Sequence, residues 1–231
     1  MLDQLRQVFS RNRPLHSAGE QYAEMQTTVR DMIATAHSSY WGGVLTDEER
    51  RQLHEIDSHV NLLQRRIRRE IVMHLSGPGT SDIPYGLLLM SLVKDTERLG
   101  DYAKNLAEVH EVTGIGAGDL PLGELTNKLM RTAQTVQSLS QEAVRVYSSA
   151  NEARATELVS EGRATAQNCD SLLRSVARAP LGPAVAVNMT LAIRYYKRIS
   201  AHQLNILSSV LLPLHELDYS RSHEDEDNQQ R

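Results

Sequence analysis

The sequence predicts an all-α fold of two tandem three-helix bundles, made of six long antiparallel helices. Three observations support this prediction. Aromatic residues make up only 4% of the chain, and much of the apolar content is Leu, Ala and Met, which favour helices over strands. Apolar residues recur at intervals of three and four, which is the spacing of one helix face. Short breaks that contain Gly or Pro separate the periodic segments, and short loops favour antiparallel neighbours.

The breaks define the helices in order along the chain. The stretch "TDEE" begins the second helix as a capping box, in which Thr46 caps the helix and Glu49 reaches back. The Gly-rich stretch 114–118 has no strand before it, so it is predicted to be a flexible linker between the bundles rather than a dinucleotide-binding loop. The predicted helices span residues 16–39, 46–75, 84–112, 122–148, 153–178 and 184–217.

This layout divides the chain into four parts. A short N-terminal segment, 1–15, carries apolar residues that are expected to dock on the bundle. The first bundle covers 16–112 and the second covers 121–219. The last part, 220–231, is acidic and polar, a composition typical of disorder.

The second helix illustrates how each helix is expected to pack. Its apolar residues are three or four positions apart and form one stripe that would face the core. These residues are Leu53, Ile56, Val60, Leu63, Ile67 and Ile71.

The two halves of the chain resemble each other. When "ERLGDYAKN" (97–105) is placed over "KRISAHQLN" (197–205), the Arg, the aliphatic residue, the small residue and the final Asn coincide. A duplication of a three-helix unit would produce this match.

Charge and cysteine content narrow the functional class. The formal net charge is −4, so no global field attracts nucleic acid or an anionic membrane. Cys169 is the single cysteine, which excludes an intramolecular disulfide and a cysteine-based metal cage. The apolar runs are too short to span a bilayer. A cytoplasmic location is therefore expected, with no nucleic-acid binding and at most peripheral membrane contact.

The histidines do not form an enzyme motif. No Glu is followed three residues later by His, which argues against a ferritin-like di-iron site. The sequence also lacks HExxH, GxxxxGK[ST] and GxSxG. We expect a protein that is not an enzyme.

A row of oxygen donors lies on the third helix. Glu97, Asp101 and Asn105 are four residues apart and so follow one side of the helix. Asp57 and Asn61 form a similar pair on the second helix. If the two helices pack side by side, these groups would form an oxygen-rich site for Mg²⁺, Mn²⁺, Fe or Zn²⁺.

The same row has a structural interpretation that the spacing alone does not exclude. Like charges four residues apart repel by a few tenths of a kcal/mol in an isolated helix. Lys94, Arg98 and Lys104 are near enough in sequence to balance them. The row would then be a solvated or salt-bridged face of a metal-free helical scaffold or of an accessory protein for another transporter.

The stretches "KDTERLGDYAKNLAE" (94–108) and "IDSHVNLLQRRI" (56–67) resemble the signature helices of the PhoU family. The resemblance implies a cytoplasmic regulator of phosphate uptake and phosphate signalling, which acts by contact with a phosphate transporter component or a sensor kinase, and as a homodimer. It also implies metal ions, iron or zinc among them, bound through the acidic motifs. Carried over to this chain, the ligands would be Glu97 and Asp101, with Asp57 as a third and Asn61, Asn105 and Asp95 shaping the site.

The second repeat departs from this pattern. Lys197 and Ala201 occupy the positions of Glu97 and Asp101. An ammonium in place of a carboxylate opposes a bound cation. We therefore expect one metal site, in the first bundle, and ion pairs or an acidic partner for Lys197 and its neighbours.

Four arginines lie close together in "QRRIRRE" (64–70): Arg65, Arg66, Arg68 and Arg69. They are either a solvated face paired with Glu70 and nearby acids, or a contact for an acidic partner protein, phosphate groups or a membrane surface.

Overall fold

The computed structural model describes residues 15–77 and 82–217, and within these ranges it contains helices and no strand. The six long helices are α2 (His16–Gly42), α3 (Asp47–Leu75), α4 (Ile83–Ala107), α6 (Glu124–Ser149), α7 (Glu152–Arg178) and α8 (Pro183–Leu211). The short ones are α5 (Val109–Thr113), η1 (Ala117–Asp119) and η2 (Leu214–Glu216). The predicted all-α fold is confirmed.

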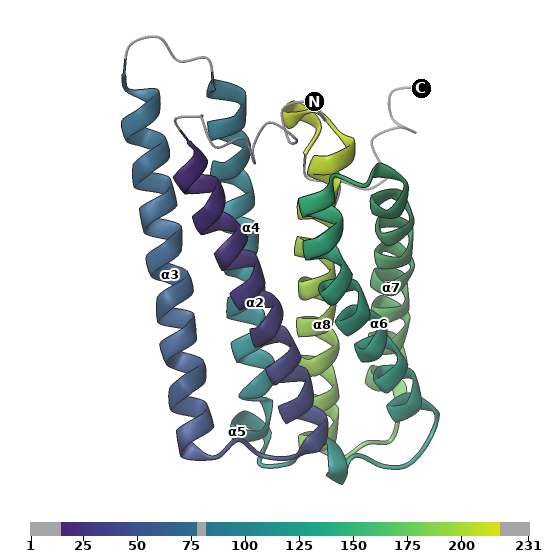
Figure 1. Ribbon diagram of the computed structural model, residues 1–231. Helices are drawn as coiled ribbons and strands as arrows, with labels where there is room; N and C mark the ends of the chain where they lie inside the picture. The colour runs from purple at the N-terminus through teal and green to yellow at the C-terminus, as the bar shows by residue number, and fades with distance from the viewer. Residues whose placement is uncertain (1–14, 78–81, 218–231) are drawn as a thin grey trace, which may run out of the picture.

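The long helices form two bundles that share one hydrophobic core. Helices α2, α3 and α4 pack against one another, and α6, α7 and α8 do the same. The bundles meet mainly where α4 packs on α8, and additionally where α2 packs on α6. Figure 1 shows α3 at one edge of the molecule and α7 at the other, with α4 and α8 between them.

The helix boundaries mostly follow the predicted punctuation. The capping box is confirmed, since the Thr46 hydroxyl accepts from the Glu49 N–H and the Thr46 N–H donates to the Glu49 carboxylate. The third predicted helix, by contrast, ends at Ala107, and α5 follows as a separate turn. The last helix ends at Leu211 because Pro213 lacks the N–H that would continue it, so only η2 follows.

The apolar stripe of α3 faces the core, with one exception. Five of the six predicted members are buried: Leu53, Val60, Leu63, Ile67 and Ile71. Ile56 is 38% exposed, so its predicted core position is wrong. The spacing assigns Ile56 to the same face as Leu63, but spacing does not show whether neighbouring helices cover that face at the level of Ile56. In the second bundle, Gly162 allows a close helix approach, because an added Cβ would lie 2.5 Å from Leu204 Cδ2.

The internal repeat is visible in the packing. Positions 91–100 of α4 and 191–200 of α8 alternate between buried, intermediate and exposed in the same order. Contacts between the two helices also follow the repeat. Asp95 pairs with His202, and Tyr102 lies against Tyr195. Replacing each position of the first pair by its repeat equivalent, 95 by 195 and 202 by 102, gives the second pair. Helices α4 and α8 are thus equivalent elements related by an approximate twofold arrangement.

The Gly-rich stretch 114–118 was predicted to be a flexible linker, but it is packed against the bundle. Ala117 is buried, and the Asn188 side-chain amide donates to the Ile115 carbonyl at 3.0 Å. Asn188 is itself fully buried and also accepts from the Tyr40 hydroxyl. This polar cluster fixes the connection between the bundles to α2 and α8.

Two predictions fall on residues outside the described ranges. These are the docking of the N-terminal segment 1–15, through Leu2, Leu5, Val8 and Phe9, and the acidic tail 220–231. Within the described ranges, no helix is both long and apolar enough to cross a membrane.

Cys169 should react with thiol reagents only when the chain unfolds. It is fully buried in α7, and burial raises the pKa of its thiol to about 12. Since the thiolate is the reactive form, labelling by iodoacetamide at pH 8 should be at least about 100-fold slower in the folded chain than in urea. The control is Ser171→Cys in a Cys169→Ala background, because Ser171 is exposed on the same helix and should label at once. Equal rates at the two positions would contradict the buried assignment.

Candidate functional site

Helices α3 and α4 pack side by side, as the metal hypothesis requires. On α4, Glu97 and Asp101 are half-buried and flank Arg98, whose guanidinium lies 3.9 Å from the Glu97 carboxylate and 3.7 Å from the Asp101 carboxylate. Both distances are longer than a strong charge-assisted hydrogen bond. Arg98 therefore balances the two acids only weakly.

Asp57 of α3 is held by a lysine of α4. The Lys104 ammonium lies 2.9 Å from Asp57 Oδ2, and both side chains are largely buried, with exposed fractions of 23% and 14%. Burial alone would lower the pKa of Lys104, but the hydrogen bond and charge of Asp57 outweigh it, and the pKa is raised. Lys104 thus stays charged and takes the place next to Asp57 that a cation would occupy.

Negative charge nevertheless accumulates around Glu97. Its pKa is raised first by burial and then by the charge of Asp101, with a smaller contribution from Asp57. Arg98 and Arg68 act in the opposite direction. The structure therefore brings Glu97, Asp101 and Asp57 within electrostatic reach of one another, which the spacing of these residues predicted.

The weaker candidate ligands are not engaged with these acids. The side chains of Asn61 and Asn105 are partly buried, and no hydrogen bond of either one is found within the described ranges. Asp95 faces the other bundle. It accepts from His202 Nδ1 at 2.7 Å and from the Asn205 amide at 3.1 Å, while the His202 ring stacks on Tyr102.

Sequence reasoning missed this Asp95–His202 link between the bundles. A signal for it was present in the offset of 100, since Tyr102 and His202 are repeat equivalents on helices that would pack together.

The oxygen atoms of these candidate ligands have the chemistry that a hard or borderline cation requires, but the side chains are not arranged around a common point. Carboxylate and amide oxygens are suitable ligands for Mg²⁺, Mn²⁺, Fe and Zn²⁺. In the part of the chain that the structure describes, however, no group of three or more His, Cys, Asp or Glu side chains is placed to hold a metal ion. The carboxylate of Asp57, the proposed third ligand, is not available because it is paired with Lys104.

The second bundle uses an ion pair at the corresponding position. The Lys197 ammonium lies 2.5 Å from Asp170 Oδ1, so α8 is tied to α7 by the lysine that replaces Glu97 in the repeat. The ion pair predicted for Lys197 is confirmed.

The four arginines in the 64–70 stretch of α3 divide into two groups. Arg65, Arg66 and Arg69 are exposed, whereas Arg68 is half-buried on the side of α4, where its charge lowers the pKa of Glu97. The predicted pairing with Glu70 is wrong. The Glu70 carboxylate instead accepts from the start of α2, namely the Ser17 hydroxyl, the Ala18 N–H and the Gln21 amide.

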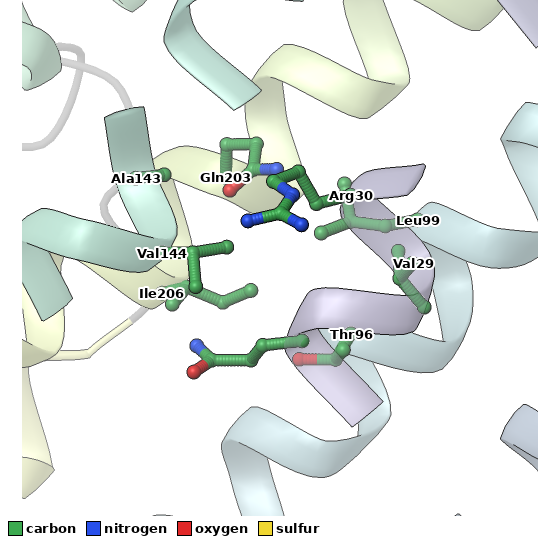
Figure 2. A pocket seen from close by; sticks show the side chains of 9 residues that line it. Val29, Arg30, Thr96, Leu99, Ala143, Val144, Gln203 and Ile206 are labelled. Carbon is green, nitrogen blue, oxygen red and sulfur yellow. The ribbon is translucent and has the colours of Figure 1, made fainter. Parts of the chain in front are cut away.

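A small gap lies where α2, α4, α6 and α8 meet. Figure 2 shows the side chains of Arg30 and Gln203 beside each other at its edge, with Val29, Leu99 and Ile206 around it. Its volume is about 10 Å³, which is room for one water at most. This junction between the bundles is therefore close-packed and does not hold a small-molecule ligand.

Comparison with known protein families matches residues 22–109, which run from α2 to the start of α5, to the PhoU domain. The chain carries a PhoU domain. The resemblance to the PhoU family, drawn from the motifs at 56–67 and 94–108, is confirmed, and all six candidate site residues lie inside the matched range.

Relatives of the PhoU domain extend the likeness beyond the first bundle. The phosphate-specific transport system accessory protein PhoU homolog of Pseudomonas aeruginosa is 25% identical over 166 residues, which are 69% of this chain and 67% of the relative. The crystal structure of PhoU from Pseudomonas aeruginosa has a TM-score of 0.74 at 21% identity and covers 87% of this chain and 96% of that one. The crystal structure of the phosphate transport system regulatory protein PhoU from Streptococcus pneumoniae has a TM-score of 0.69 at 16% identity. It covers 87% of this chain and 95% of that one. These structures share the fold of both bundles.

Proposed function

We propose that this chain regulates phosphate transport and phosphate signalling. The observation that carries the proposal is the PhoU domain at 22–109, together with a relative that is a phosphate-specific transport system accessory protein. The match covers the α3–α4 pair, where the family motif lies, and the fold likeness extends over both bundles.

The regulator acts by protein contact rather than by catalysis. Its partner is a component of a phosphate transporter or a sensor kinase. It works in the cytoplasm as a homodimer, with at most peripheral membrane contact. Support comes from the surface of α3, where arginines and apolar side chains are exposed together. Such a mixture is typical of protein interfaces.

A cation bound at Glu97 and Asp101 is a further part of the proposal. The environment of Glu97 supports it, because burial and, after it, the charge of Asp101 raise the pKa of this carboxyl, and a bound cation would stabilise its charged form. Asp57 joins as a third ligand when Lys104 leaves it. The metal-free scaffold is the second candidate, and the Lys104–Asp57 ion pair favours it.

Deletion of the gene in its native host tests the regulatory role. The expected result is altered uptake of radiolabelled phosphate and a phosphate-starvation response that no longer follows external phosphate. Re-expression of the chain from a plasmid should restore both. Unchanged uptake and an unchanged starvation response in the deletion strain would overturn the proposed function, whatever metal the protein binds.

A further inference from the structure

One side of α3 combines positive charge with exposed apolar groups. Leu62 is 41% exposed, Val72 is 55% exposed and Met73 is 70% exposed. The three exposed arginines lie between them in sequence, and all six residues are separated by steps that keep them on one side of the helix. We call this the α3 arginine face: Leu62, Arg65, Arg66, Arg69, Val72 and Met73.

Among residues 15–77 and 82–217, the acidic side chains around this face are engaged elsewhere. Glu70 is the one acidic residue between Asp57 and Asp82, and its carboxylate is occupied by three donors at the start of α2. Two acids of α2 are also engaged, since Glu20 contacts His16 and Glu24 contacts His59. In the part of the chain that the structure describes, the three exposed arginines are therefore left without an acidic partner.

The face borders a hollow between α3 and α2. The hollow has a volume of about 560 Å³ and is lined by Gln21 of α2 and by Arg66, Arg69, Glu70, Met73 and His74 of α3. Since α3 lies at the edge of the molecule and packs mainly on α2 and α4, nothing else in the described ranges covers this side (Figure 1). An extended or helical segment can therefore approach along the helix.

We propose that the α3 arginine face docks an acidic, amphipathic segment of a partner protein. Its carboxylates would pair with Arg66 and Arg69, whose planar guanidinium groups bind carboxylates through two parallel hydrogen bonds. Its apolar side chains would cover Met73 and Val72. This inference rests on the proposed regulatory function and specifies the chemistry of the partner.

A protein partner fits these observations better than a membrane does. The net charge of the chain is −4, which opposes approach to an anionic bilayer. No aromatic residue belongs to the face, although aromatic side chains commonly anchor interfacial helices. Met and Arg, by contrast, are enriched in protein interfaces.

The test uses the full chain and a dye-labelled synthetic helix with Glu along one side and Leu along the other. Fluorescence anisotropy should show saturable binding, and R66E/R69E should weaken it at least about 10-fold because two charge-assisted contacts become repulsive. The matched control is R174E/R178E. Its arginines are exposed on α7 and the change in net charge is the same, so its affinity should stay within about twofold of the wild type.

Several results would overturn the proposal. One is an equal loss of affinity in the two variants, which would mean general electrostatic attraction. Another is that the peptide does not bind, whereas phosphatidylserine vesicles or inorganic phosphate do bind and R66E/R69E abolishes that binding.

Met73→Ser gives a separate readout, since it keeps every charge and should weaken peptide binding several-fold through lost apolar contact.

Phosphate uptake separates this inference from the proposed function. If gene deletion alters uptake and R66E/R69E restores it as fully as the wild-type chain does, the docking face is wrong and the regulatory role stands. If deletion itself has no effect, the regulatory role fails, and the peptide affinities still decide whether the face binds acidic segments.

Discussion

Replacement of Tyr196 by alanine is expected to lower the free energy of unfolding by about 3–5 kcal/mol. Tyr196 lies in α8 and is fully buried. Its hydroxyl accepts from Trp41 Nε1 at 3.2 Å and lies 3.1 Å from His37 Nδ1, both on α2. Its ring meets the ring of Tyr40 edge to face. The substitution would thus open a cavity between the two bundles and leave polar groups of α2 without a partner.

Urea unfolding followed by circular dichroism and by fluorescence measures this effect. Trp41 is the single tryptophan of the chain, so its emission reports directly on the contact with Tyr196. Tyr196→Phe keeps the ring and should cost only about 2 kcal/mol, the value of the two hydrogen bonds that its hydroxyl makes. Tyr195→Ala is the positional control, because its neighbouring ring is only partly buried. A Tyr196→Ala chain as stable as the wild type would refute the packing of α2 on α8.

Much of this fold could be predicted from the sequence because local signals were strong. Thr46 and Glu49 form a motif that caps helices wherever it occurs, and the three-to-four spacing along α3 indicates a buried stripe. The ends of α4 and α8 were predicted less well. Apolar residues continue past Ala107 and Leu211, so the pattern did not mark the points at which the helices stop.

The sequence predicted which helix faces carry the candidate site residues, but not which side chains they would contact. Spacing placed Glu97 and Asp101 on one side of α4, and the structure brings Asp57 within their electrostatic reach. Spacing could not show that Lys104 would hold Asp57, since this depends on the register between α3 and α4. The same limit explains why Glu70 was matched with the nearby arginines, when its partners lie about fifty residues away in α2.

The Glu97→Ala/Asp101→Ala double variant is expected to weaken binding of Mn²⁺ more than about 100-fold, because it removes two ligand carboxylates from the proposed site. Titration calorimetry on tag-free protein measures the affinity, and elemental analysis of the purified protein measures the resident metal. If the wild type and the double variant carry the same metal content, the site assignment is wrong. If chelators also leave the melting temperature of the wild type unchanged, the metal-free scaffold is the correct interpretation.

Lys104→Met should have the opposite effect and tighten Mn²⁺ binding about 10-fold, because it frees Asp57 and removes one positive charge from the site. Lys94→Met is the matched control. Lys94 is exposed on the same helix, and its removal changes the net charge equally without touching Asp57. Similar gains in the two variants would mean that overall charge, rather than release of Asp57, sets the affinity. A gain restricted to Lys104→Met, lost again when Asp57 is changed to Asn in the same chain, would establish that α3 and α4 supply ligands to one cation and that the protein's own ammonium competes with it.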